Sequence, residues 1–367
     1  MFRLLIAGGG TGGHLFPALS VAEEFLLRDA ETEVLFVGTG RPIEQEILGS
    51  RGFSARKITA AGLMGKSLRA RLVSLGKLPV GLVQSAFILL NFKPNLVFCV
   101  GGYSSGPVGL AARLFGFTLA IQEQNSVPGL ANRLLGRMAD LIFISFESAR
   151  SFFPPGKTHL TGNPVRLEIE KVGEVGKTGR CGVLNLLIMG GSQGAHAINE
   201  TAVKAMRTLS HEGVELSITH QTGTVDQGVV KQAYQDLKLN WEVFDFIQDI
   251  IQFYEKADLI LSRCGALTVS EVAASGRPAI FIPLPSPDNH QEKNAMSLVE
   301  AGAARIIRQK DLSPELLAEM IAEYTSDREK LMEMGRKARE AALLNAAREI
   351  TRICLSHQKI GKKEKLD

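Results

Sequence analysis

The sequence has few cysteines, few aromatic residues and no long apolar run. Four cysteines are spread over 367 residues without a CxxC spacing, which is typical of reduced thiols and not of disulfides or a metal cluster. They are Cys99, Cys181, Cys264 and Cys354. The longest weakly polar run, residues 78–92, is shorter than the roughly 20 residues of a spanning helix. The sequence therefore predicts no membrane span. Glycines at 8–13 interrupt the apolar start, so no signal peptide is predicted either.

Acidic residues are absent from a long part of the first half. Residues 47–122 contain nine Lys and Arg residues and no Asp or Glu. Residues 1–165 carry a net charge of +6 and residues 166–367 carry −2, within a total of +4. Chance and a solvated surface are the simpler explanation. The imbalance nevertheless favours an anionic surface or ligand near the first half.

Glycine-rich turns are abundant, and three of them follow short apolar strands. They read GGGTGGH at 8–14, GGYSSG at 101–106 and GGSQG at 190–194. A strand that breaks into glycines and restarts as a helix directs free N–H groups and the positive end of the helix dipole at one spot. The turns therefore predict phosphate or pyrophosphate sites.

Apolar strands alternate with helical patterns along the whole chain, which predicts parallel sheets covered on both faces. The strands are expected at 4–7, 34–37, 96–100, 119–121, 141–144, 186–189, 215–219, 259–261 and 279–282. The first helix is expected near 17–27, with Pro17 in its first turn.

The repeated starts LLIAGGG and LLIMGGS predict two similar α/β domains, each a doubly wound, Rossmann-like parallel sheet, facing a cleft. The boundary falls near 162–166, giving domains at 1–165 and 166–342. Residues 168–182 are polar and aperiodic and are expected to form a loop.

The first glycine turn matches neither common nucleotide motif. No Gly-Lys-Ser/Thr follows it, and no acid closes the next strand at 34–37, so a plain tight turn is one interpretation. His14 supports a functional role for this turn, because a helix N-terminus disfavours the charged imidazolium form of histidine. A neutral His14 could accept a proton from a sugar hydroxyl, although a capping role is the alternative.

Polar residues follow three further strands. Glu123 and Asn125 are suited to sugar hydroxyls, unless they are simply solvated. Glu271 lies in the helix after 259–261 and could bind both ribose hydroxyls, or merely complement the helix dipole. Gln291 follows 279–282. No DxD pair is present, so no metal cofactor is expected.

A basic, leucine-bearing segment follows residue 65. Leu68, Leu72 and Leu75 recur at helical spacing beside Lys66 and Arg69. An ordinary amphipathic helix packed on its own core explains the pattern about equally well. The acid-free surroundings favour a helix that rests on an anionic membrane surface.

Six motifs occur in order from Gly8 to about Ala304: GGGTGGH, GGYSSGP, EQN, GNPVR, GGSQG and SRCGALTVSE. In this set the chain closely resembles the bacterial peptidoglycan N-acetylglucosaminyltransferases that convert lipid I to lipid II. The resemblance implies a GT-B glycosyltransferase fold, with a C-terminal helix at about 343–360 that packs back on the first domain. It implies an inverting hexosyltransferase that moves GlcNAc from UDP-GlcNAc to the 4-hydroxyl of MurNAc in undecaprenyl-pyrophosphoryl-MurNAc-pentapeptide, in cell-wall synthesis and thus cell shape and division.

The resemblance also assigns residues. The acid-base candidates are His14 and Glu123. The donor contacts implied are Thr11, Gly12, Gly13, Asn125, Arg166, Ser192, Ile247, Ala266, Leu267, Thr268, Val269, Ser270, Glu271 and Gln291. The acceptor pyrophosphate would meet Gly10, Gly102, Tyr103 and Ser104. The family commonly has Gln where this chain has His290, and Ser where it has Cys264.

The implied location is peripheral, on the cytoplasmic face of the bacterial inner membrane, with other cell-wall synthesis proteins as possible partners and no nucleic acid. Two other functions remain open. Related two-domain folds glycosylate diacylglycerol or epimerise UDP-GlcNAc, and a non-catalytic nucleotide-sugar-binding subunit would share the donor site. The sequence does not determine oligomeric state, peptide-stem preference or cation effects.

Overall fold

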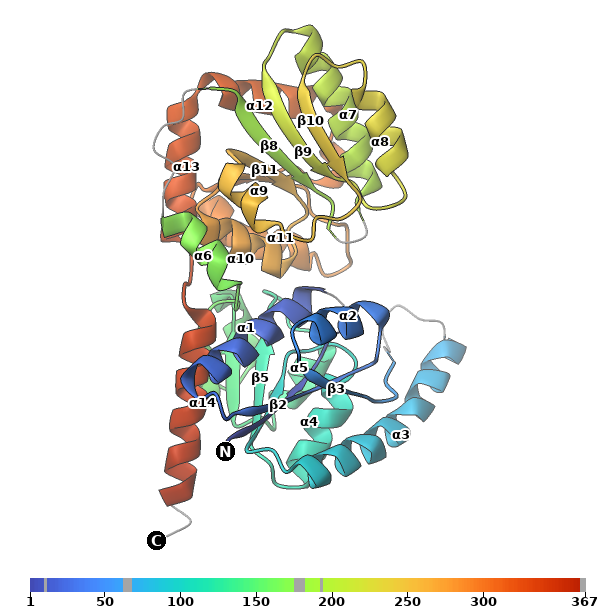
Figure 1. Cartoon of the computed structure of the whole chain (residues 1–367), viewed down its shortest axis with the longest axis vertical. Helices are drawn as coiled ribbons and strands as arrows, with labels where there is room; N and C mark the ends of the chain where they lie inside the picture. The colour runs from blue at the N-terminus through green and yellow to red at the C-terminus, as the bar shows by residue number, and fades with distance from the viewer. Residues whose placement is uncertain (10–11, 62–67, 175–181, 192–193, 364–367) are drawn as a thin grey trace. The chain divides into compact units, whose positions relative to one another are not determined.

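The computed structural model describes residues 1–9, 12–61, 68–174, 182–191 and 194–363. The chain divides into two compact units (Figure 1). Unit 1 comprises Met1–Arg166 with Asn345–Asp367, and unit 2 comprises Leu167–Leu344. Each is built on its own parallel sheet.

Unit 1 contains a seven-stranded sheet in the order β3-β2-β1-β4-β5-β6-β7, with every neighbouring pair parallel. Its strands are β1 (Arg3–Ala7), β2 (Glu33–Gly38), β3 (Ser54–Lys57), β4 (Leu96–Cys99), β5 (Leu119–Glu123), β6 (Leu141–Ile144) and β7 (Thr158–Leu160). Its helices are α1 (Gly12–Arg28), α2 (Pro42–Ser50), α3 (Leu68–Phe92), α4 (Ser105–Leu114), α5 (Leu130–Leu135) and α14 (Ala346–Lys363). Two apolar clusters, one on each face, bury this sheet.

Unit 2 contains a six-stranded parallel sheet in the order β10-β9-β8-β11-β12-β13. Its strands are β8 (Leu184–Met189), β9 (Leu216–Gln221), β10 (Asn240–Phe244), β11 (Leu259–Ser262), β12 (Ala279–Phe281) and β13 (Ala304–Ile306). Its helices are α6 (Leu167–Glu174), α7 (His196–His211), α8 (Gln227–Tyr234), α9 (Ile251–Lys256), α10 (Ala266–Ser275), α11 (His290–Glu300), α12 (Pro314–Ser326) and α13 (Arg328–Glu340). Both sheets thus repeat one doubly wound strand order, as the sequence predicts.

The C-terminal helix α14 returns to unit 1 and packs along α1 (Figure 1). Ile350 and Cys354 of α14 are fully buried in the same apolar cluster as Leu15, Leu19 and Ala22 of α1. The end of the chain therefore completes the core of the first unit.

Two expectations about helices are wrong. The first helix begins at Gly12, so Pro17 lies inside it and not in its first turn. Because proline has no N–H, α1 lacks one internal hydrogen bond at this point. Residues 168–174, expected in a loop, belong to the helix α6, whose Ile169 and Val172 are buried. Their three-residue spacing was the helical signal.

Candidate functional site

Each unit has a topological switch point, where the chain leaves neighbouring strands in opposite directions. In unit 1 it lies between β1 and β4, and in unit 2 between β8 and β11. Ligands of doubly wound sheets bind at the carboxyl ends of such strands. The three glycine turns follow these strands; α1 and α4 begin within the first two turns, at Gly12 and Ser105, and α7 begins at His196, just after the third.

In unit 1 the two glycine turns pack backbone against backbone. A Cβ added to Gly102 would lie 2.8 Å from the carbonyl oxygen of Gly9. The Ser105 hydroxyl oxygen lies 2.8 Å from the carbonyl oxygen of Ala7, at the end of β1, and 2.7 Å from that of Gly101, so its one hydrogen can bond either of them. Gly102 has a φ of +79°, which glycine adopts without strain. The turns therefore form one continuous backbone surface next to two helix N-termini.

His14 lies beside this surface, in the first turn of α1. A Cβ on Gly101 would be 3.2 Å from Nε2 of the His14 ring and 3.4 Å from the Asn132 amide nitrogen. Enclosure by protein atoms lowers the pKa of His14 to about 4. The ring is thus a neutral imidazole at physiological pH because of desolvation, whereas the sequence pointed to the helix N-terminus as the cause. Its role as a proton acceptor stays a prediction.

Glu123 ends β5 in a fully enclosed position, with 1% of its surface exposed. Its Oε1 accepts hydrogen bonds from the backbone and side-chain nitrogens of Asn125, at 2.9 and 3.2 Å. Its Oε2 accepts from the Gly129 backbone and the Asn132 amide, at 3.1 and 3.0 Å. Burial raises the pKa of Glu123, and these donors oppose the shift. The carboxylate therefore holds the 124–129 loop in place, which favours His14 over Glu123 as the base.

The other acceptor candidates of unit 1 lie around the second turn. Ser104 is buried and Tyr103 is half exposed, directly before α4. Gly12 and Gly13 lie in the first turn of α1. Gly10, Thr11, Ser192 and Lys66, also named from the sequence, lie outside the described residues.

Arg166, predicted as a donor contact of the second domain, groups with unit 1. Its guanidinium carbon lies 5.0 Å from the centre of the Phe16 ring on α1, a cation–π arrangement. The same ring faces Gly12, where an added Cβ would meet it at 3.2 Å. Arg166 therefore adds positive charge near the first glycine turn.

In unit 2 the predicted donor residues gather at the start of α10, next to the third glycine turn. Gly265 caps this helix, and Glu271 lies one turn further in, 7% exposed, where it accepts a hydrogen bond from the Tyr254 hydroxyl at 3.2 Å. Ala266 and Val269 face the core, whereas Leu267, Thr268 and Ser270 are partly exposed. Gln291, in the first turn of α11, accepts from the Leu284 backbone at 3.0 Å.

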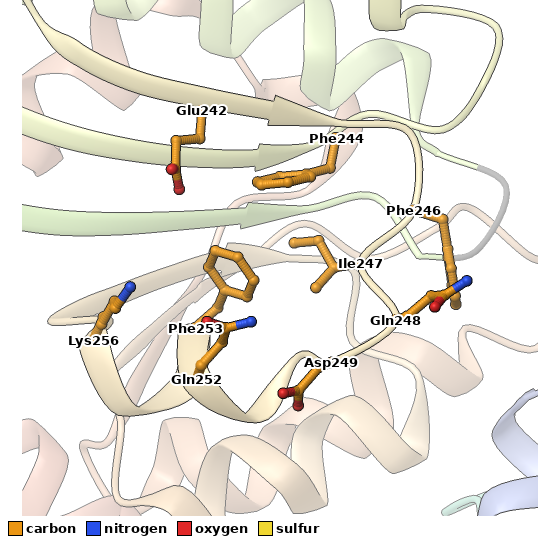
Figure 2. A pocket seen from close by; sticks show the side chains of 9 residues that line it. All are labelled: Glu242, Phe244, Phe246, Ile247, Gln248, Asp249, Gln252, Phe253 and Lys256. Carbon is orange, nitrogen blue, oxygen red and sulfur yellow. The ribbon is translucent and has the colours of Figure 1, made fainter.

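Ile247 lines a pocket of about 350 Å³ between β10 and α9 (Figure 2). Phe244 and Phe253 meet edge to face there, with ring centres 5.4 Å apart. Glu242, Asp249 and Lys256 supply charge around this apolar floor. The pocket was not predicted, because its residues form no sequence motif.

An exposed apolar stripe runs along α3. Val80, Val83, Phe87 and Leu90 recur every three or four residues and are 48–70% exposed. We call these four residues the α3 stripe. The membrane contact expected from the sequence comprises Leu68, Arg69, Leu72 and Leu75, which lie earlier in the same helix, as their helical spacing predicts. The α3 stripe itself was missed, although its spacing was visible in the sequence.

Within the described part of the chain, no helix is both long and apolar enough to cross a membrane. The same residues contain no group of three or more His, Cys, Asp or Glu side chains that could hold a metal ion. Cys99, Cys264 and Cys354 are free thiols in buried positions.

Comparisons with known proteins agree with this architecture. Residues 4–144 match the glycosyltransferase family 28 N-terminal domain, and residues 185–350 match the glycosyltransferase family 28 C-terminal domain. The two units and their glycine turns thus define a glycosyltransferase of the GT-B fold.

Similar proteins of known name identify the family more specifically. A UDP-N-acetylglucosamine–N-acetylmuramyl-(pentapeptide) pyrophosphoryl-undecaprenol N-acetylglucosamine transferase of Geobacter sulfurreducens is 46% identical over 351 residues, 95% of this chain and 96% of that protein. The enzyme of that name from Myxococcus xanthus is 41% identical over 97% of this chain and 93% of its own. The crystal structure of MurG from Acinetobacter baumannii has a TM-score of 0.76 and 32% identity, over 97% of this chain and 100% of that one. The chain belongs to this family of N-acetylglucosamine transferases.

A more distant structure shares the fold alone. The UDP-GlcNAc 2-epimerase of Neisseria meningitidis has a TM-score of 0.70 over 97% of this chain and 100% of its own, at 14% identity. Fold likeness therefore does not separate transferase from epimerase, and the sequence relatives do.

Proposed function

We propose that this protein transfers GlcNAc from UDP-GlcNAc to the 4-hydroxyl of MurNAc in undecaprenyl-pyrophosphoryl-MurNAc-pentapeptide. The observation that carries the proposal is the position of the His14 ring, which lies against the joined glycine turns of unit 1. A proton acceptor beside an anion-binding surface is what a pyrophosphate-linked acceptor with a reacting hydroxyl requires.

Unit 2 holds the donor in this proposal. The Glu271 carboxylate binds the ribose hydroxyls, and the glycine turn at 190–194 binds the diphosphate next to the N-terminus of α7. The remaining donor contacts are those named from the sequence. Unit 1 holds the acceptor pyrophosphate on Gly102, Ser104 and the first turn.

The transfer is a single displacement. The MurNAc 4-hydroxyl oxygen forms a bond to the anomeric carbon of GlcNAc while the bond from that carbon to the diphosphate oxygen breaks. UDP leaves with the electron pair, and Nε2 of His14 takes the hydroxyl proton. Attack opposite the leaving group inverts the anomeric configuration. Backbone N–H groups stabilise the departing diphosphate, and we propose that no metal cofactor is needed.

We also propose a peripheral position on the cytoplasmic face of the bacterial inner membrane. The α3 stripe would enter the lipid interface, and the exposed Lys77 and Lys93 at either end of it would meet anionic headgroups. The acid-free composition of residues 47–122 supports this orientation. A lipid-linked acceptor would then reach unit 1 without leaving the bilayer.

A transfer assay tests the proposal. The purified protein is incubated with radiolabelled UDP-GlcNAc and a short-chain analogue of the MurNAc lipid, and label is measured in the lipid product. We expect transfer that requires the acceptor and persists in EDTA. Epimerisation of UDP-GlcNAc without acceptor would instead identify an epimerase, and donor binding without transfer would identify a binding subunit.

A further inference from the structure

One buried side chain in unit 2 joins two loops that end different strands. Gln221 is the last residue of β9 and is 5% exposed. Its Nε2 donates a hydrogen bond to the carbonyl oxygen of Gly191 in the third glycine turn, at 3.0 Å. Its Oε1 accepts a hydrogen bond from the backbone nitrogen of Ile247, also at 3.0 Å. A single side-chain amide therefore spans the glycine turn and the Ile247 segment.

The two contacts require an amide. Glutamine carries a donor and an acceptor in one plane, so it satisfies a carbonyl and an N–H at the same time. An ionised glutamate has no donor and would turn an oxygen toward the Gly191 carbonyl. Leucine would leave the buried Ile247 N–H without this partner, which is costly, and would remove one of the two donors to the exposed Gly191 carbonyl. The position is therefore chemically selective rather than a matter of filling space.

The strand end that carries Gln221 is itself rigidly held. His220 is fully buried, with Nδ1 2.9 Å from the Tyr234 hydroxyl and Nε2 3.1 Å from Oδ1 of Asn199. The Asn199 amide donates to the carbonyl oxygen of Thr222 at 2.9 Å. The residues on both sides of Gln221 are thus anchored to α7 and α8, so its amide is pre-oriented.

We propose that Gln221 is a positioning residue that sets the diphosphate-binding turn and the Ile247 segment in one fixed arrangement for the uridine diphosphate part of the donor. The inference rests on the proposed function. Gly191 has a φ of +84°, and its carbonyl oxygen also accepts a hydrogen bond from the Gly194 backbone at 3.1 Å, so Gln221 adds a second donor that fixes the direction of this carbonyl. The two hydrogen bonds of the Gln221 amide, which we call the brace, link the phosphate end of the site to the nucleoside end.

Binding of UDP and of uridine, measured by calorimetry on the full chain, tests the proposal. We expect Gln221→Leu to raise the Kd of UDP at least tenfold. Gln221→Glu retains the acceptor for Ile247 and loses the donor for Gly191, so UDP should bind about tenfold more weakly while the Kd of uridine stays within about twofold. Relative to the wild type at the same pH, the UDP affinity of Gln221→Glu should recover as the pH falls, because a protonated carboxyl donates again.

Transfer kinetics supply a second readout. The KM for UDP-GlcNAc should rise in both variants, with kcat within about threefold and the acceptor KM unchanged. Gln232→Glu, an exposed glutamine on α8, is the matched control and should alter nothing. If Gln221→Leu fails to fold, the isosteric Gln221→Glu carries the test.

The outcomes separate the two proposals. UDP binding by Gln221→Leu within twofold of the wild type would overturn the brace, as would equal weakening of uridine and UDP in Gln221→Glu. A wild type that binds UDP but transfers nothing would overturn the proposed function and leave the brace standing.

Discussion

In both units the first strand along the chain, β1 or β8, ends in a glycine turn, yet the side chains around the two turns differ. Unit 1 places the His14 imidazole against the turn and joins it to a second glycine turn at β4. In unit 2 the strand that corresponds to β4 is β11. It is followed by α10, which carries the Glu271 carboxylate. Unit 2 braces its turn with the Gln221 amide.

These different side chains suggest how one doubly wound strand order can be adapted to two kinds of substrate. The strand order supplies N–H groups and helix N-termini in both units, which is enough for a phosphate but does not select the rest of the ligand. Unit 1 adds a neutral histidine and an exposed apolar stripe, which the proposed function assigns to a lipid-linked acceptor. Unit 2 adds the Glu271 carboxylate and the Gln221 amide, which it assigns to the nucleotide. Under this proposal, variants of His14 and the α3 stripe should affect turnover and membrane binding, and variants of Glu271 and Gln221 should affect donor affinity.

The largest effect is expected from His14→Ala. Loss of the base should lower kcat by about 10² to 10⁴ with little change in the KM for UDP-GlcNAc, because His14 is not among the proposed donor contacts. His211→Ala, an exposed histidine of unit 2, is the control and should retain full turnover. Near-normal turnover of His14→Ala at saturating substrates would remove His14 from the mechanism.

The pH dependence of kcat/KM in the wild-type protein tests the role of His14 without a mutation. Because the pKa of His14 is lowered to about 4, the base form is present above that value. The contribution of His14 to kcat/KM should stay constant from pH 7 to about 5 and fall only as the pH approaches 4. A loss of activity centred near 6.5 that His14→Gln abolishes would contradict the lowered pKa of this ring.

The next effect concerns the apolar surface that only unit 1 is proposed to use. Val83→Ser and Phe87→Ser together remove two side chains that are 69% and 70% exposed. Each buried apolar side chain contributes about 1.5–3 kcal/mol to partitioning, so binding to anionic phospholipid vesicles should weaken tenfold or more. Soluble acceptor analogues should still be turned over.

Unit 2 offers matched controls for the stripe. Val225 and Val229 are 85% and 71% exposed, so Val225→Ser and Val229→Ser change similar surface elsewhere. Vesicle binding should be unaffected by them. Equal losses from the two pairs of variants would show that exposed valines of either unit contribute and would refute the assignment to α3.

The sequence predicted the middle of each sheet and missed its margins. All nine expected strands are present, and the four that were overlooked, β3, β7, β10 and β13, are the outermost strands of the two sheets. Every residue of β3 is exposed, so its sequence SARK carries no apolar signal. Inner strands are buried on both faces and read as continuous apolar runs, whereas edge strands are defined by pairing with a neighbour.

The candidate sites divide in a similar way. The glycine turns and His14 were found because a local motif encodes them. Gln221 and Asn132 were missed because each is a single amide whose partners lie in distant segments, 30 and 26 residues away for Gln221 and up to ten for Asn132. Arg166 was found by its motif, but its place beside Phe16 of unit 1 was not. Motifs thus locate backbone geometry, and tertiary contacts determine which side chains support it.

A smaller effect is expected on the pH dependence of the stability of unit 2, through His220. Burial lowers the pKa of His220 to about 3, with Asp226 opposing the shift. Between pH 6.5 and 3 the unfolded chain binds a proton there that the folded chain does not, so stability falls as the pH falls. This residue alone should cost about 2 kcal/mol between pH 8 and pH 5.

Urea unfolding followed by the fluorescence of Trp241 measures this in unit 2. It is the single tryptophan of the chain, and its ring lies 6.0 Å from that of Tyr234, the partner of His220. His220→Gln should be less stable at pH 8 but lose less stability on acidification. The exposed His211→Gln should keep the wild-type dependence, and an unchanged dependence in His220→Gln would refute the assignment.

The smallest effect is expected from Cys264→Ser, at a position between β11 and α10. Cys264 is fully buried, and burial raises its thiol pKa to about 12, so it is neither a thiolate nor a nucleophile at neutral pH. The substitution exchanges one neutral side chain for another of similar shape, so kcat and the KM for UDP-GlcNAc should change less than about threefold. The buried hydroxyl should lower stability by about 1 kcal/mol. A larger rise in donor KM would mean that the side chain at 264 contacts the donor, which would add a further selective group to unit 2.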